Sequence, residues 1–102
     1  MKSAVRSGIL AAAMAASLPA AASDDLAKKY ACSACHTIDT KLVGPTFKEV
    51  AAKYRDDKAA PAKLAEKVKK GSQGVWGSIP MPPNPTVPDA DVTALVSWIL
   101  SQ

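Results

Sequence analysis

The stretch Cys32-Ser33-Ala34-Cys35-His36 determines most of what can be expected of this chain. Two cysteines three positions apart, followed at once by a histidine, form the C-x-x-C-H pattern that is typical of covalent attachment of a c-type haem. The two thiols can reach the two vinyl groups on one edge of a haem, and His36 then lies beneath the iron as an axial ligand. The pattern therefore predicts one haem c held by Cys32 and Cys35, and a small core that is largely porphyrin.

The N-terminal segment has the layout of a secretory signal peptide. Lys2 and Arg6 precede an apolar run over residues 8–18, and the small residues of 19–22 offer a cleavage site. The apolar run is too short to span a bilayer. We therefore expect residues 1–22 to be removed on export to the periplasm and residues 23–102 to form one domain. The alternative is an N-terminal helix that stays attached.

The part that remains after cleavage is short for a stable apolar core. The whole chain has 102 residues, and small domains usually need a disulfide, a metal or another staple. A covalent haem is such a staple, and it also offers a large apolar surface on which side chains can pack.

Charge and cysteine content disfavour other classes of protein. The formal net charge of +4 falls to +2 when Lys2 and Arg6 are removed. No dense lysine and arginine stripe with interleaved aromatic residues is present, so we expect no nucleic-acid binding. Cys32 and Cys35 are the only cysteines. A disulfide or a thiol oxidoreductase is the alternative use of such a pair, but the adjacent His36 and the missing βαβ pattern argue against it.

Hydrophobic periodicity predicts an all-α fold of three to five short helices around the cofactor. The first helix is expected to begin at Ser23, with acidic residues in its first turn, and to run into Cys32. Thr46 is expected to cap the second helix, with Glu49 as its capping-box partner. An apolar stripe is expected along this helix at Phe47, Val50, Ala51 and Tyr54. Trp98, in the last helix, is expected to be structural, because buried aromatic residues usually belong to the core.

Met81 is the candidate for the sixth ligand of the iron. Met1 and Met14 leave with the expected signal peptide, and His36 is the only histidine. A thioether ligand opposite a histidine raises the reduction potential. The flanking prolines restrict the backbone and so hold this weak ligand in place. The alternative is that Met81 is an ordinary loop hydrophobe and that the sixth position is open or taken by a lysine.

Three further positions are candidates for contacts around the iron and the haem edge. A loop carbonyl near Gly44-Pro45 is the candidate acceptor for the second N–H of His36. Trp76 either donates its indole N–H to a propionate or packs in the core. Asn84 either hydrogen-bonds near the sulfur of Met81 or caps a turn.

Several segments together resemble the small bacterial class I cytochromes c of the c-551/c-552 type. They are the C-x-x-C-H motif, Ile38-Asp39-Thr40-Lys41, Val43-Gly44-Pro45, the run GSQGVWG over residues 71–77 and the run IPMPPN over residues 79–84. The resemblance extends over essentially all of residues 23–102. Residues 84–88 look one residue longer and richer in proline than the resemblance leads one to expect.

The resemblance implies the compact monohaem cytochrome c fold, in which the N- and C-terminal helices pack across each other. It also implies a role at the haem for eight residues: thioether bonds from Cys32 and Cys35, axial ligation by His36 and Met81, a hydrogen bond from His36 to the Pro45 carbonyl, a contact of Asn84 near the Met81 sulfur, and propionate contacts from Trp76 and Lys67.

The expected function is that of an electron carrier and not an enzyme, with the redox chemistry belonging to the haem. The resemblance implies a membrane quinol oxidoreductase as donor, and nitrite reductase, terminal oxidases or a peroxidase as acceptors. We expect a monomer without stable membrane insertion that docks transiently on its redox partners at the haem edge, near Ala34 and Val43. The competing hypotheses are a haem enzyme or gas sensor with an open iron, and a thiol-disulfide oxidoreductase.

Overall fold

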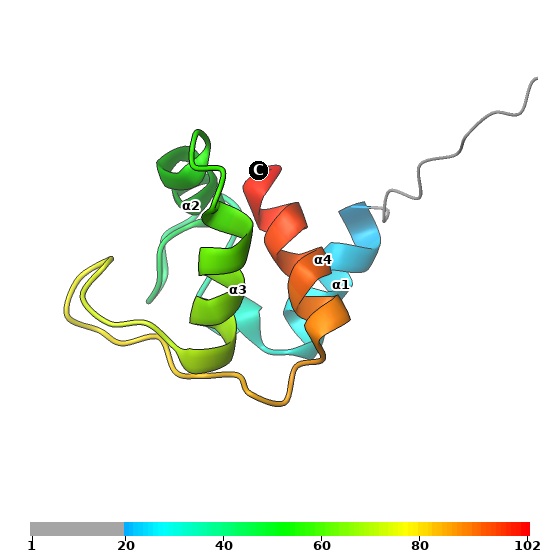
Figure 1. The fold of residues 1–102 in the computed structure, drawn as a ribbon. Helices are drawn as coiled ribbons and strands as arrows, with labels where there is room; N and C mark the ends of the chain where they lie inside the picture. Colours follow the sequence, from blue (N-terminus) through cyan, green and yellow to red (C-terminus); the bar gives the residue numbers. More distant parts are fainter. Residues whose placement is uncertain (1–19) are drawn as a thin grey trace, which may run out of the picture.

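The computed structural model describes residues 20–102, with side chains from residue 23 onward. These residues form four α-helices, one short 3₁₀ helix and no strand (Figure 1), so the all-α prediction is confirmed for this part of the chain: α1 Ala20–Lys29, η1 Cys32–Ala34, α2 Phe47–Tyr54, α3 Ala60–Lys70 and α4 Asp89–Leu100. No helix among residues 20–102 is long and apolar enough to cross a membrane. Most of the expected signal peptide lies outside the described residues.

Helix α4 is the centre of the fold. It packs against α1, α2 and α3, and Figure 1 shows it lying directly beside α1. Its residues Val92, Leu95 and Val96 are buried. Trp98 is also buried and meets Phe47 of α2 edge-on, with ring centroids 5.1 Å apart. Trp98 is therefore structural, as predicted, and the N- and C-terminal helices pack together as the resemblance implied.

Helix α2 begins where its sequence predicts, with one of the two hydrogen bonds of the expected capping box; none between the Thr46 N–H and the Glu49 carboxylate is found among the described residues. The Oγ1 atom of Thr46 accepts a hydrogen bond from the backbone N–H of Glu49 at 3.0 Å, which satisfies one of the free donors of the first turn. The apolar positions spaced one and two turns apart face the core and are all buried: Phe47, Val50, Ala51 and Tyr54. The cap and the stripe together fix where the helix begins and which face it turns inward.

Helix α1 differs from its prediction at both ends. It begins at Ala20 and not at Ser23, because residues 20–22 are all alanine, the residue with the highest helix propensity. Ser23 is therefore buried inside the helix and does not cap it. The helix ends at Lys29, and Ala31 adopts a left-handed conformation with φ 60°. The attachment motif thus lies on a separate turn, η1, and not on a continuation of α1.

The long segment between α3 and α4 carries Met81. Gly71 ends α3 with a φ of 82°, a conformation that favours glycine. Ser72 and Met81 then pair in an isolated antiparallel bridge. The residues between them project as the narrow loop drawn in yellow in Figure 1, and the chain then returns past the end of α3 to the start of α4.

Candidate haem-binding site

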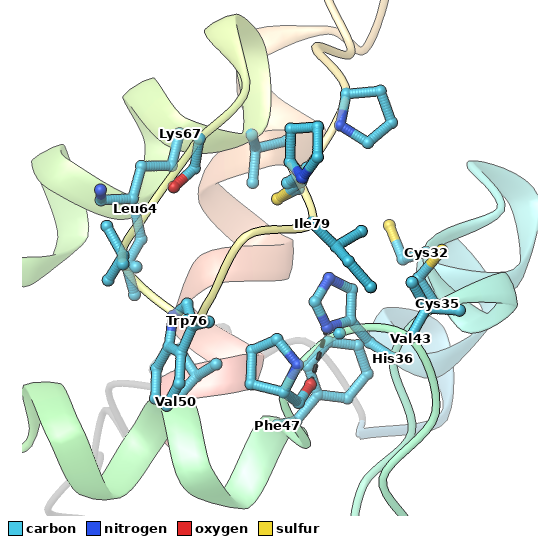
Figure 2. A pocket seen from close by; sticks show the side chains of 18 of the residues that line it. Cys32, Cys35, His36, Val43, Phe47, Val50, Leu64, Lys67, Trp76 and Ile79 are labelled. Atoms are coloured by element: carbon cyan, nitrogen blue, oxygen red, sulfur yellow. Dashed lines mark hydrogen bonds between the residues drawn. The ribbon is translucent and has the colours of Figure 1, made fainter.

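An apolar pocket of about 440 Å³ lies among α3, α4 and the loops that carry the motif and Met81. Its volume is within the range of roughly 300–1,000 Å³ that is typical of cofactor and ligand sites. Figure 2 shows Cys32, Cys35 and His36 on one side of the pocket and Lys67 and Trp76 on the other. Seven of the eight predicted site residues line it: Cys32, Cys35, His36, Pro45, Lys67, Trp76 and Met81. Asn84 is not among its lining residues.

The short helix η1 presents the motif to this pocket. The backbone N–H groups of Cys35 and His36 both donate to the carbonyl oxygen of Cys32, at 3.1 and 2.9 Å. This turn brings both thiols and the imidazole to the same cavity, and the two cysteines form no disulfide. Burial raises the pKa of the Cys32 thiol. Reactive thiols in redox motifs have a lowered pKa, so the surroundings of Cys32 do not support the thiol-disulfide oxidoreductase hypothesis.

One hydrogen bond defines the tautomer of His36. Its Nδ1 atom lies 2.7 Å from the carbonyl oxygen of Pro45, the acceptor expected from the sequence. A carbonyl can only accept, so Nδ1 carries the proton. The other ring nitrogen, Nε2, then has its lone pair free, which is the form in which a histidine binds a metal.

The ring of His36 also lies tightly against the backbone at Gly44. A β-carbon built on Gly44 would lie 2.6 Å from Cε1 and 2.8 Å from Nδ1 of His36. The N–H of Gly44 donates to the carbonyl oxygen of Cys35 at 2.8 Å, which closes the loop between them. Phe47 stacks on the imidazole, with ring centroids 5.5 Å apart. The sequence placed Gly44 in a loop that supplies the acceptor for His36, but it carries no signal for this steric role.

Met81 is fixed through its backbone. Its N–H donates to the carbonyl oxygen of Ser72 at 2.8 Å, and the N–H of Ser72 donates back to Met81 at 3.1 Å. Gly71 approaches so closely that a β-carbon there would lie 2.7 Å from the Met81 carbonyl oxygen. The pocket-lining thioether therefore comes from a backbone position that is fixed on two sides.

The outer contacts are only partly as expected. The side-chain amide of Asn84 donates to the Pro82 carbonyl oxygen at 3.3 Å, which matches the alternative of a turn cap. Its contact near the Met81 sulfur stays a prediction. Trp76 is 41% exposed, and the Nζ atom of Lys53 lies 5.5 Å from the centroid of its ring. The propionate contacts of Trp76 and Lys67 also stay predictions.

The residues present fit a haem. The cavity is apolar, as a porphyrin requires, and it gathers two thiols, an imidazole with a free Nε2 and a thioether on its walls. Gly44 leaves only the room that the imidazole occupies. A soft thioether and an imidazole are ligands that iron accepts in haem proteins.

Comparison with known proteins agrees with this site. The sequence model of the family described as Cytochrome c matches residues 20–102. The chain is 52% identical to cytochrome c-552 of Nitrosomonas europaea over 101 residues, which cover 99% of this chain and 98% of that protein. It is 56% identical to cytochrome c-551 of Pseudomonas aeruginosa over 77 residues, or 76% of this chain and 73% of that protein.

Solved structures of cytochromes c have the same fold as this chain. The crystal structure of wild-type Nitrosomonas europaea cytochrome c552 superposes with a TM-score of 0.75 at 59% identity, covering 76% of this chain and 96% of that one. The class 1 cytochrome MtoD from Sideroxydans lithotrophicus superposes with a TM-score of 0.71 at 29% identity, covering 83% and 97%. The chain therefore belongs to the cytochrome c family: it is a small electron carrier with one covalently attached c-type haem.

Proposed function

We propose that the chain is an exported one-electron carrier in which His36 and Met81 are the axial ligands of the iron. Cys32 and Cys35 form the thioether bonds to the haem. The observation that carries the proposal is that these four side chains, from two distant segments, line one apolar pocket. The bound haem supplies the Fe(III)/Fe(II) couple, and the protein supplies its ligands and its surroundings.

The protein holds both proposed ligands in place through contacts that do not involve the haem. The Pro45 carbonyl keeps the imidazole of His36 in the tautomer with a free Nε2. The backbone pairing with Ser72 holds Met81. Ligands that are held in place in both oxidation states move little when an electron arrives, which favours fast transfer. A thioether ligand favours the reduced iron and so raises the reduction potential.

The exposed edge of the pocket suits transient docking on redox partners. Leu42, Val43 and Ile79 line the pocket and are 48%, 54% and 66% exposed. Ala34 is exposed near the cysteines, and Lys41 also lines the pocket. A small apolar patch beside a positive charge fits weak and fast encounters, in which charge steers the approach and the interface stays small. We infer that the protein acts as a monomer through this edge.

We also propose a periplasmic location and redox partners of the kind that the resemblance to small bacterial cytochromes c implies. The signal-peptide layout of residues 1–22 supports export to the periplasm. The similarity to the Nitrosomonas relative covers 99% of the chain and so reaches into this segment. On the same resemblance, we propose a membrane quinol oxidoreductase as the donor and terminal reductases or oxidases such as nitrite reductase as the acceptors.

A redox titration of the exported holoprotein, followed by its absorption spectrum, tests the proposal. The ferric protein should show the weak band of Fe(III)–Met ligation, and the haem should survive acid-acetone extraction. Met81→Ala should keep the haem, lose that band, lower the potential and let added imidazole bind. Ile79→Ala, at an exposed position of the same loop, should keep the band. An unchanged potential in Met81→Ala would refute the ligand assignment and favour a haem protein with another sixth ligand.

A further inference from the structure

The segment that follows Met81 has few donors of its own. Residues 82–88, here called the strap, contain Pro82, Pro83, Pro85 and Pro88, none of which has a backbone N–H. The N–H of Asn84 donates to the Val68 carbonyl oxygen of α3 at 2.9 Å. Within the strap the N–H of Val87 reaches only the Asn84 carbonyl oxygen, at 3.4 Å, so the carbonyls of Pro85 and Val87 take their donors from elsewhere.

Lys69, in the last turn of α3, supplies such a donor. Its Nζ atom lies 2.7 Å from the carbonyl oxygen of Val87 and 3.5 Å from that of Pro85. The same atom lies 2.9 Å from Oδ1 of Asp89, the first residue of α4. One ammonium group thus joins the end of α3, the strap and the start of α4.

The surroundings distinguish Lys69 from an ordinary surface lysine. Its side chain is 31% exposed, whereas the neighbouring Lys70 is 75% exposed and pairs with Glu66 one turn earlier. The N-terminal end of a helix repels a positive charge, yet the Lys69 ammonium lies at the start of α4. Asp89 is 92% exposed, so solvent screens this ion pair and it contributes little. The contact with the buried end of the strap, at Val87, is therefore the important one.

We propose that Lys69 is a positioning residue for the Met81 ligand, an inference that rests on the proposed ligation by Met81. The bridge to Ser72 holds Met81 on one side, and the strap that Lys69 fastens begins directly on the other side. Between Met81 and Val87, three of the five residues are prolines with fixed φ angles, and only Asn84 and Thr86 can absorb a displacement of the strap, so much of it reaches Met81. Release of Lys69 raises the fraction of molecules in which the thioether has left the iron.

Binding of imidazole to the ferric holoprotein measures that fraction. The apparent affinity of an added ligand scales with the population of the open state. A hydrogen bond from a charged donor is strong enough for Lys69→Met to increase the imidazole affinity about tenfold, which corresponds to about 1.4 kcal/mol. Lys69→Arg keeps the donors and should stay close to the wild type. Lys70→Met is the matched control. Both Lys70→Met and Asp89→Asn should leave the imidazole affinity unchanged.

The outcomes separate the possible roles of Lys69. A lysine that only fastens α3 to α4 would lower the Tm in Lys69→Met without changing imidazole affinity, and this result overturns the proposal. An equal gain of affinity in Asp89→Asn also overturns it, since the ion pair would then be the effective contact. Should Lys69→Met yield no holoprotein, Lys69→Gln carries the same expectation, because its amide is uncharged and lies one bond closer to the backbone. A wild-type protein without the Fe(III)–Met band refutes Met81 ligation itself, whatever Lys69 does.

Discussion

His36 and Gly44 are in contact in a way that excludes any side chain at position 44. The imidazole Cε1 and Nδ1 atoms occupy the space in which a β-carbon on Gly44 would lie, at 2.6 and 2.8 Å. The same Nδ1 atom donates to the carbonyl oxygen of the next residue, Pro45, at 2.7 Å. One turn of the chain thus sets both the orientation and the tautomer of the predicted iron ligand.

Gly44→Ala is expected to displace the imidazole. The added methyl group must push either His36 or the loop away, and overpacking of this kind costs about 1–3 kcal/mol. We expect a lower Tm of the holoprotein together with a changed visible spectrum, measured on the same sample. Gly77→Ala is the control, because Gly77 does not line the haem pocket and a β-carbon there meets nothing within 4 Å, although φ is 120°. It should lower the Tm without altering the spectrum, and an unchanged spectrum in Gly44→Ala would contradict the steric role.

Cys35→Ala tests whether the haem is part of the core. Cys35, Leu95 and Val96 all line the haem pocket, and the two α4 residues are otherwise buried. Impaired haem attachment should therefore impair folding as well, as seen by haem staining on a denaturing gel and by far-UV circular dichroism. Ser33→Ala, between the two cysteines, should leave both signals unchanged. A Cys35→Ala protein that stays stably folded without haem would show that the protein core is sufficient by itself.

The features that could be predicted from the sequence are those that local patterns encode. The buried stripe of α2 and its Thr46 cap depend on residues three or four positions apart, and they are present as expected. The participation of His36 and Met81 in one pocket followed from a motif and from the number of histidines and methionines. These inferences need no knowledge of how distant segments meet.

The features that could not be predicted depend on contacts between distant segments or on competing local preferences. Lys69 meets the Val87 carbonyl only because the chain folds back past α3, and a lysine in a last helical turn is usually solvated. The predicted start of α1 was wrong because the alanines before Ser23 favour a helix more strongly than Ser23 favours a cap. The predicted end of α1 was wrong because Ala31 adopts a left-handed conformation that alanine seldom takes.

Thr46→Ala is expected to weaken the start of α2. The Oγ1 atom of the buried Thr46 accepts a hydrogen bond from the N–H of Glu49 at 3.0 Å. The methyl side chain of alanine has no atom that can accept this hydrogen bond. Loss of such a cap costs about 1 kcal/mol, which lowers the Tm of a domain of this size by roughly 4–8 °C. Thr93→Ala is a matched control on the exposed face of α4. A thermal melt in which both variants behave like the wild type would mean that the cap contributes nothing.

The hydrogen bond between Tyr30 and Asp91 predicts a pH dependence of stability. The Tyr30 hydroxyl donates to Oδ2 of Asp91 at 2.5 Å, joining the end of α1 to α4. This hydrogen bond, together with burial and the nearby negative charge, raises the pKa of Tyr30.

The folded protein therefore holds the phenol proton more tightly than the unfolded chain, whose tyrosines titrate near pH 10. The stabilisation is fully present below about pH 10 and is lost as the pH rises through the higher pKa of the folded state. A double-mutant cycle of Tyr30→Phe and Asp91→Asn, followed by thermal unfolding, should show a stabilising coupling at neutral pH that disappears at alkaline pH. A coupling that is the same at both pH values would contradict the assigned hydrogen bond.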